Sequence, residues 1–299
     1  MTRTSRRPAS FLVVVEAMAV YAIWASTWPV GKLALSFWTP AGLTCIRHVL
    51  AGVLLVGLGR LLGDSLRLPS RAETAIGLLQ YASYYLFSYK ALASGSTAVT
   101  AVVVALYPVI VMIFSLNATS LRLQGFLAAI LGAAGCGLIV MGSTSDSGLD
   151  IQLPSVALAL FAALAQAAST LIRREPATPS KIIGFTGRSM FVGGVASGAL
   201  VLVSGDRIFQ QEPGVLAVST LMWLSLMGSA VTFVAVEYLL RRWRPVFVSI
   251  SYFSVPCLAV VMAHVFLNEA ITFSMTLGIG LCLAAIFLSA RSLGGSNHA

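Results

Sequence analysis

Long apolar runs, most of them about 20 residues in length, dominate the sequence and are separated by short polar connections. An α-helix needs a run of about that length to cross the hydrocarbon core of a bilayer. Only 10% of the residues are charged, and 58% are hydrophobic. A soluble domain carries roughly 25% charged residues, so this chain has too little polar surface to cover a fold in water. We therefore expect an all-α integral membrane protein.

Ten of these runs are predicted to be membrane-spanning helices, with connections too short for a separate water-soluble domain. The first run follows three arginines, as a signal peptide would. It is long, however, and has no clear small-residue cleavage site before Trp24, so we interpret it as an uncleaved span. The predicted ranges are 11–32, 40–62, 73–92, 96–117, 122–142, 154–173, 182–204, 214–238, 245–267 and 270–290.

The distribution of Lys and Arg predicts the orientation in the membrane. If the N-terminus is cytoplasmic, fourteen of the 19 basic residues fall in cytoplasmic segments, two lie within spans, and only Lys32, Lys90 and Arg207 fall in outer segments. Cytoplasmic loops of membrane proteins carry such an excess, so both termini are expected in the cytoplasm (N-in, C-in). The net charge of +9 is accordingly attributed to topology rather than to nucleic-acid binding.

The chain also contains an internal repeat. A shift of 148 residues places Pro108 on Pro256, and a shift of 141 residues places Arg47 on Arg188. Each half then holds five spans, and because five is odd, the two five-helix repeats must be inverted in the membrane. Inverted repeats are typical of alternating-access transporters, whose substrate sites lie between the halves. The predicted halves of this single membrane domain are 1–148 and 149–299.

Four stretches carry motifs that point to a family. They are 24–32 (WASTWPVGK), 91–109 (which contains ALASGSTAVT and LYPV), 238–258 (YLLRRWRPVFVSISYFSVPCL) and 267–272 (LNEAIT). Together they resemble EamA-type carriers of the drug/metabolite transporter (DMT) superfamily, and within it the chain is most similar to YddG-like amino-acid exporters. The turn at 117–122 departs from many relatives because it lacks an acidic residue that would match Glu269.

The resemblance implies a basket of ten helices in the bacterial cytoplasmic (inner) membrane. Its expected function is secondary transport that exports amino acids, aromatic and other neutral ones, by alternating access through a central cavity. Export of other small metabolites or drugs is the alternative, and a static channel also stays open. An enzyme is not expected because the sequence lacks a catalytic cluster such as HExxH. No cofactor or metal site is expected, and the partners are a small-molecule substrate and lipid, with a monomer or an oligomer left open.

Polar and aromatic side chains in the middle of spans are the candidates for a substrate cavity. Trp24 and Trp28 are four residues apart and share one helical face, as do Gln80 and Tyr84. A mid-span amide such as that of Gln166 must find a hydrogen-bond partner or water. Each of these residues either packs in the protein interior or lines the cavity. The full candidate set is Trp24, Trp28, Gln80, Tyr84, Tyr107, Gln166, Trp223, Ser249 and Tyr252.

Two arginines within spans, Arg47 and Arg188, are candidates for steering a substrate carboxylate, because a guanidinium donates two parallel hydrogen bonds. The alternative is that they pair within the protein or reach lipid phosphates.

Pro108 and Pro256 interrupt the backbone hydrogen bonds of their helices, and they are predicted to act in gating or to impose a fixed bend.

Acidic side chains are scarce near the spans. Glu16, Glu237 and Glu269 lie toward span ends and are interpreted as anchors at the membrane interface, with Glu237 expected to pair with Arg241 four residues later. All four aspartates fall in predicted loops. Because no carboxylate is expected in the middle of the membrane, tight proton coupling through an acidic relay is not expected.

Overall fold

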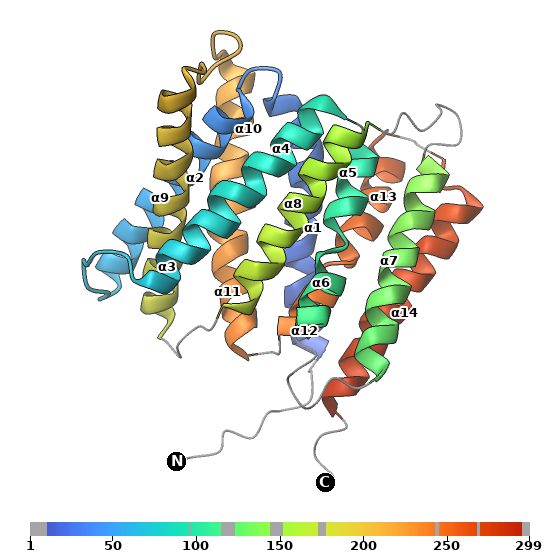
Figure 1. Ribbon diagram of the computed structural model, residues 1–299. Coiled ribbons are helices and arrows are strands. Elements are labelled where there is room, and N and C mark those ends of the chain that lie inside the picture. Colours follow the sequence, from blue (N-terminus) through green and yellow to red (C-terminus); the bar gives the residue numbers. More distant parts are fainter. Residues whose placement is uncertain are drawn as a thin grey trace, which may run out of the picture.

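The computed structural model describes residues 11–95, 97–114, 123–143, 152–172, 178–242, 245–267 and 270–294. Within these residues the chain is helical throughout, and the pairing of Trp38 with Phe209 is an isolated antiparallel bridge rather than a strand. The helices stand side by side as one bundle, with α1 beginning and α14 ending at the lower face of Figure 1. The all-α class is thus confirmed for the described part of the chain.

Seven helices and one π-helical stretch make up the first half of the chain. The third predicted span is built from three consecutive segments, α3, η1 and α4, and the π-helical η1 lies in its middle. The bounds are α1 Phe11–Ala34, α2 Pro40–Leu61, α3 Arg71–Ile76, η1 Gly77–Tyr84, α4 Tyr85–Ser94, α5 Thr97–Val104, α6 Tyr107–Phe114 and α7 Leu123–Ser143.

The second half is built in the same manner. Its eighth predicted span is composed of α10, η2 and α11, with a second π-helical stretch in the middle. The bounds are α8 Leu153–Leu171, α9 Pro179–Ser204, α10 Val215–Ser225, η2 Leu226–Val231, α11 Thr232–Arg242, α12 Pro245–Ser251, α13 Ser254–Leu267 and α14 Phe273–Gly294.

Local sequence explains where several helices start and stop. Thr39 caps α2 by accepting a hydrogen bond from the Gly42 amide at 3.1 Å, and Pro40 occupies the first helical position, where no amide donor is needed. Ser70 and Glu73 form a reciprocal capping box at the start of α3. Gly205 ends α9 in the left-handed conformation, with φ of 68°.

Two close helix pairs bound the bundle, α2 with α9 at the left and α7 with α14 at the right of Figure 1. Glycines allow the backbones to approach. A Cβ atom on Gly52 of α2 would lie 2.6 Å from the Phe191 amide nitrogen, and one on Gly135 of α7 would lie 2.6 Å from the Gly278 carbonyl oxygen. Small residues at such contacts are typical of helix packing in membranes, and each pair joins the two halves of the sequence.

The fourth and ninth predicted spans are interrupted rather than merely bent. α5 ends before α6 at residues 105–106, and α12 ends before α13 at residues 252–253, in each case just before a proline. The Leu106 amide donates to the Val103 carbonyl at 3.2 Å, and the Tyr252 amide donates to the Ser249 carbonyl at 3.1 Å, so both interruptions contain tightened turns. Whether these interruptions move during transport stays a prediction.

Five helical stretches are long and apolar enough to cross a membrane, and three shorter stretches are also apolar. The long ones are Pro40–Leu61, Gly125–Gly142, Leu153–Leu171, Pro179–Ser204 and Val215–Arg241, and the shorter ones are Thr100–Phe114, Val248–Met262 and Phe273–Ser289. In each of the ten predicted ranges most of the described residues are helical. The count of ten spans, the inverted repeat and the N-in, C-in orientation stay predictions.

Candidate functional site

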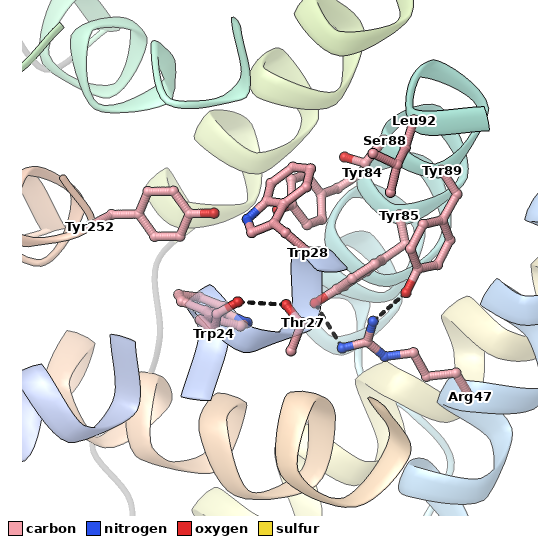
Figure 2. A pocket seen from close by; sticks show the side chains of 10 residues that line it. All are labelled: Trp24, Thr27, Trp28, Arg47, Tyr84, Tyr85, Ser88, Tyr89, Leu92 and Tyr252. Carbon is pink, nitrogen blue, oxygen red and sulfur yellow. Dashed lines mark hydrogen bonds between the residues drawn. The ribbon is translucent and has the colours of Figure 1, made fainter. Parts of the chain in front are cut away.

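A small cavity lies among α1, α2, the η1–α4 helix and the interruption between α12 and α13 (Figure 2). Its volume is about 20 Å³, which is room for about one water molecule. The cavity is therefore almost filled by its own side chains. Its lining consists of Trp24, Thr27, Trp28, Arg47, Tyr84, Tyr85, Ser88, Tyr89, Leu92 and Tyr252.

Aromatic rings form one wall of the cavity. The ring of Trp24 meets that of Tyr252 edge to face, with centroids 5.3 Å apart, and it meets Phe233 in the same way at 5.0 Å. Trp28 follows Trp24 on the same face of α1, and Figure 2 shows its indole nitrogen pointing toward the Tyr252 hydroxyl. Such a wall suits a flat or apolar group. Four of the residues proposed from sequence, the two tryptophans with Tyr84 and Tyr252, thus lie together at the cavity.

Arg47 brings a buried positive charge to the opposite wall, with only 1% of the residue exposed. Its Nε donates to the Ser229 hydroxyl at 2.6 Å, and its Nη2 donates to the Gly228 carbonyl at 2.7 Å. On the side of α4, Nη2 donates to the Tyr85 hydroxyl at 3.3 Å and Nη1 donates to the Tyr89 hydroxyl. The guanidinium carbon also lies 4.3 Å from the centre of the Tyr85 ring, a cation–π contact.

All of these Arg47 partners are neutral. Among the described residues, no carboxylate lies within ion-pair distance of Arg47, and none of the ten lining residues is acidic. A guanidinium is able to donate paired hydrogen bonds to a carboxylate or another oxyanion.

Arg188, the other arginine proposed from sequence, has a different environment. Its Nη1 donates to Asp64 Oδ2 at 2.7 Å and its Nε donates to Glu73 Oε1 at 2.8 Å, with all three side chains buried. Glu73 also accepts two hydrogen bonds from Arg67, at 2.7 and 2.9 Å. These contacts join α9 to α3 and to the connection after α2, and Arg188 is not among the cavity-lining residues. We call these four side chains the Arg188 ion-pair network.

The two glutamines lie outside the cavity lining. Gln80 Oε1 accepts a hydrogen bond from the Ser169 hydroxyl at 3.0 Å, so η1 is joined to α8. Gln166 Oε1 is buried and has no hydrogen-bond partner among the described residues. Tyr84 therefore lines the cavity, whereas Gln80, four residues earlier in η1, is engaged with α8.

Tyr107 and Ser249 support the cavity from behind. The Tyr107 hydroxyl donates to the Ser249 carbonyl at 3.4 Å, and its ring packs edge to face on Tyr252 with centroids 5.1 Å apart. Pro108 and Pro256 immediately follow the two helix interruptions beside these residues. Both prolines therefore lie close in sequence to the aromatic wall but do not line it.

Trp223 lies away from the cavity. Its side chain is 42% exposed, and its indole nitrogen donates to the Ser26 hydroxyl at 3.2 Å.

The predicted pair between Glu237 and Arg241 is confirmed, with Oε2 and Nη2 3.9 Å apart. Glu269 and the side chain of Glu16 lie outside the described residues. No group of His, Cys, Asp or Glu residues that could hold a metal ion occurs in the described ranges.

Several lining residues were not singled out by the sequence as site candidates. Tyr85 and Tyr89 are four residues apart in the aromatic third span, and that spacing was the available indication. Glu73 was also missed. Its indication was the capping-box pattern with Ser70, which fixes a carboxylate at the start of a helix.

Comparison with known proteins gives a consistent result. The model of the EamA-like transporter family matches residues 12–141 and 153–291. The chain is 25% identical to YvbV, an uncharacterized transporter of Bacillus subtilis, over 89% of this chain and 87% of that one. It is also 25% identical to YedA, an uncharacterized inner membrane transporter of Escherichia coli, over 90% and 88%. A solved crystal structure covers 96% of this chain and 99% of its own with a TM-score of 0.75 at 18% identity, and it shows the fold alone.

Proposed function

The chain belongs to the EamA-like transporter family of the DMT superfamily, and from that premise we propose that it exports amino acids across the bacterial inner membrane. As a member of that family it is a multi-pass membrane protein that carries small molecules. The proposed substrates are aromatic and other neutral amino acids, as in YddG-like exporters. Secondary transport by a monomer is the simplest form of the proposal.

One observation carries the proposal: a buried guanidinium and an aromatic wall face each other across a single cavity (Figure 2). Arg47 offers donors for a carboxylate, and Trp24, Trp28 and Tyr252 offer surface for a side chain. A polyanion would find a single cation, Arg47, to balance its several negative charges. A hydrophobic cation would be repelled by the positive charge of Arg47. The lining therefore favours an amino acid over a phosphorylated metabolite or a cationic drug.

The small volume of this cavity supports the proposal of alternating access. With room for about one water molecule, it must widen before an amino acid enters. The helix interruptions before Pro108 and Pro256 lie next to Tyr107 and Tyr252, so a change of angle there would move the aromatic wall. We propose that α5–α6 and α12–α13 open the cavity by turns to the two sides of the membrane.

Flux into and out of proteoliposomes tests the proposal. Vesicles with purified protein are loaded with labelled Trp, Phe, Thr, Met, Lys, Glu, a nucleoside or a cationic dye, each with and without an imposed pH gradient. Saturable movement of the neutral and aromatic amino acids, without movement of dye or nucleoside, is the expected result. The response to the gradient measures proton coupling.

Protein-free vesicles and vesicles with heat-inactivated protein provide the controls. Movement of the dye or the nucleoside in place of amino acids would reject amino-acid export and leave the family assignment intact. Flux that rises in proportion to concentration without saturation would reject a carrier and indicate a channel.

A further inference from the structure

The charges at the cavity are one-sided. An amino acid at neutral pH carries a carboxylate and an ammonium group. The lining contains a cation, Arg47, but no acidic side chain. The two charged groups of the proposed substrate therefore meet unequal surroundings.

The partners of Arg47 divide into a fixed set and an exchangeable set. Ser229 and Gly228, on η2, hold Nε and one hydrogen of Nη2 at 2.6 and 2.7 Å. On the cavity side, the guanidinium donates only to the phenol hydroxyls of Tyr85 and Tyr89 (Figure 2). A phenol is a neutral acceptor, and a carboxylate accepts charged hydrogen bonds about twice as strongly. A ligand carboxylate can therefore replace the two phenols while η2 holds the rest of the side chain.

Ser88 gives a second, independent indication. It lines the same cavity from α4, it is 5% exposed, and its hydroxyl has no hydrogen-bond partner among the described residues. Buried hydroxyls are normally hydrogen-bonded. A ligand in the cavity would supply the missing partner, and a carboxylate oxygen is an acceptor of the right kind.

An ammonium group would have only aromatic faces and neutral hydroxyl oxygens of the lining to bind. Those faces attract a cation more weakly than a carboxylate does, and the charge of Arg47 opposes it. We infer that the site recognises its substrate through the carboxylate held by Arg47 and does not require the amino group. The substrate class is then aromatic and apolar monocarboxylates, of which neutral amino acids are one subset. This inference rests on the proposed carrier function and deepens it.

Competition among three indole compounds tests the inference. Labelled tryptophan flux is measured at pH 7 in the presence of unlabelled tryptophan, indole-3-propionate (carboxylate only) or tryptamine (ammonium only). The concentration of indole-3-propionate that halves the flux is expected to lie within about threefold of that of unlabelled tryptophan. For tryptamine this concentration is expected to be at least about tenfold higher. Labelled indole-3-propionate is expected to be transported with saturation.

The outcomes separate this inference from amino-acid export. Competition by tryptamine but not by indole-3-propionate would overturn carboxylate recognition and leave amino-acid export standing. Saturable flux of indole-3-propionate without tryptophan flux would reject amino-acid export and support carboxylate recognition. Absence of flux for both compounds would overturn both proposals.

Substitutions assign the preference to Arg47. In Arg47→Gln the half-inhibitory concentrations of indole-3-propionate and tryptamine should lie within about threefold of each other, because the positive charge that distinguishes the two compounds is gone. Arg47→Lys should keep the preference with weaker competition by the carboxylate, since an ammonium lacks the two-pronged geometry. Lys90→Gln removes an exposed cation from the same region and is the matched control, with no expected change. An unchanged preference in Arg47→Gln would overturn the inference.

If Arg47→Gln does not fold, the remaining variants decide. Ser88→Ala removes the unpartnered hydroxyl. It is expected to weaken competition by indole-3-propionate a few-fold without strengthening competition by tryptamine. Equal weakening of all three competitors by Ser88→Ala and Arg47→Lys would indicate a purely structural role and overturn the inference. Gel filtration in detergent identifies the variants that fold.

Discussion

Arg47 and Arg188 occupy matching places in the two halves of the sequence, yet their surroundings differ. Arg188 is held by two buried carboxylates, those of Asp64 and Glu73. Arg47 is held by hydroxyls, a carbonyl and an aromatic ring, with no carboxylate nearby among the described residues. Arg188 therefore pairs within the protein, whereas Arg47 is the arginine that we propose binds a ligand. The same residue type at matched sequence positions thus has two different environments.

The energetic reason lies in desolvation. Transfer of a charge from water to a protein interior costs several kcal/mol per ion, and an opposite charge with good geometry offsets that cost. The Arg188 ion-pair network contains its own compensation. Around Arg47 the compensation comes from neutral hydrogen-bond acceptors and an aromatic ring, so under our proposal a bound carboxylate would add the missing opposite charge.

Removal of Arg188 should have the largest effect on stability. Arg188→Met leaves Asp64 buried without its ion-pair partner and Glu73 paired with Arg67 alone. Loss of one member of a buried ion pair costs about 3–5 kcal/mol. We expect a clear fall in the midpoint of thermal unfolding of the purified protein in detergent. Arg207→Met, which removes an exposed arginine, is the control. A fall equal to that of the control would show that the network does not stabilise the fold.

Removal of Arg47 should impair transport more, and stability less, than removal of Arg188 does. Arg47→Gln takes away a buried charge that has no carboxylate partner, so its unfolding midpoint should fall less than that of Arg188→Met. Hydrogen bonds to charged groups are worth about 1.5–3 kcal/mol, so tryptophan flux at low concentration should fall roughly 10- to 100-fold. Thermal unfolding and flux measured on the same preparations test this. Equal losses in both variants would remove the distinction between the two arginines.

The wall facing Arg47 can be tested with two tryptophans. Trp24→Ala removes ring contacts with Tyr252 and Phe233 and should lower tryptophan flux by about tenfold, as aromatic contacts are worth about 0.5–1.5 kcal/mol each. Trp223→Ala, on the exposed surface, should change the flux less than about twofold. A larger effect of Trp223→Ala would place the substrate path elsewhere.

The paired prolines should give the smallest effect. In Pro108→Ala or Pro256→Ala an amide donor returns at a helix interruption, so the segments can rejoin into a straighter helix. We expect the maximal rate of tryptophan flux to fall about threefold in each variant, with half-saturation unchanged, because conformational steps set many turnover rates. Saturation curves in proteoliposomes measure both quantities. A change in half-saturation alone would assign the prolines to shaping of the cavity.

Most of the helices could be predicted from the sequence because a membrane-spanning helix requires a long run of apolar residues. The helical ranges and the face shared by Trp24 and Trp28 follow from chain-local rules of length and spacing. The partners of Arg188 did not follow, since Asp64 and Glu73 lie more than 100 residues away and their approach depends on how α9 packs. The exclusion of Gln80 from the cavity did not follow either, because its hydrogen bond to Ser169 depends on how η1 packs against α8, 89 residues away in the sequence.

The small volume of the closed cavity has an electrical consequence. A cell membrane holds its voltage only where no continuous file of water crosses it, because protons and ions follow water. Side chains that leave room for about one water molecule break such a file at the cavity. We therefore expect the empty carrier in this state to conduct no protons through the cavity, so that many copies in the membrane would leave the proton gradient intact.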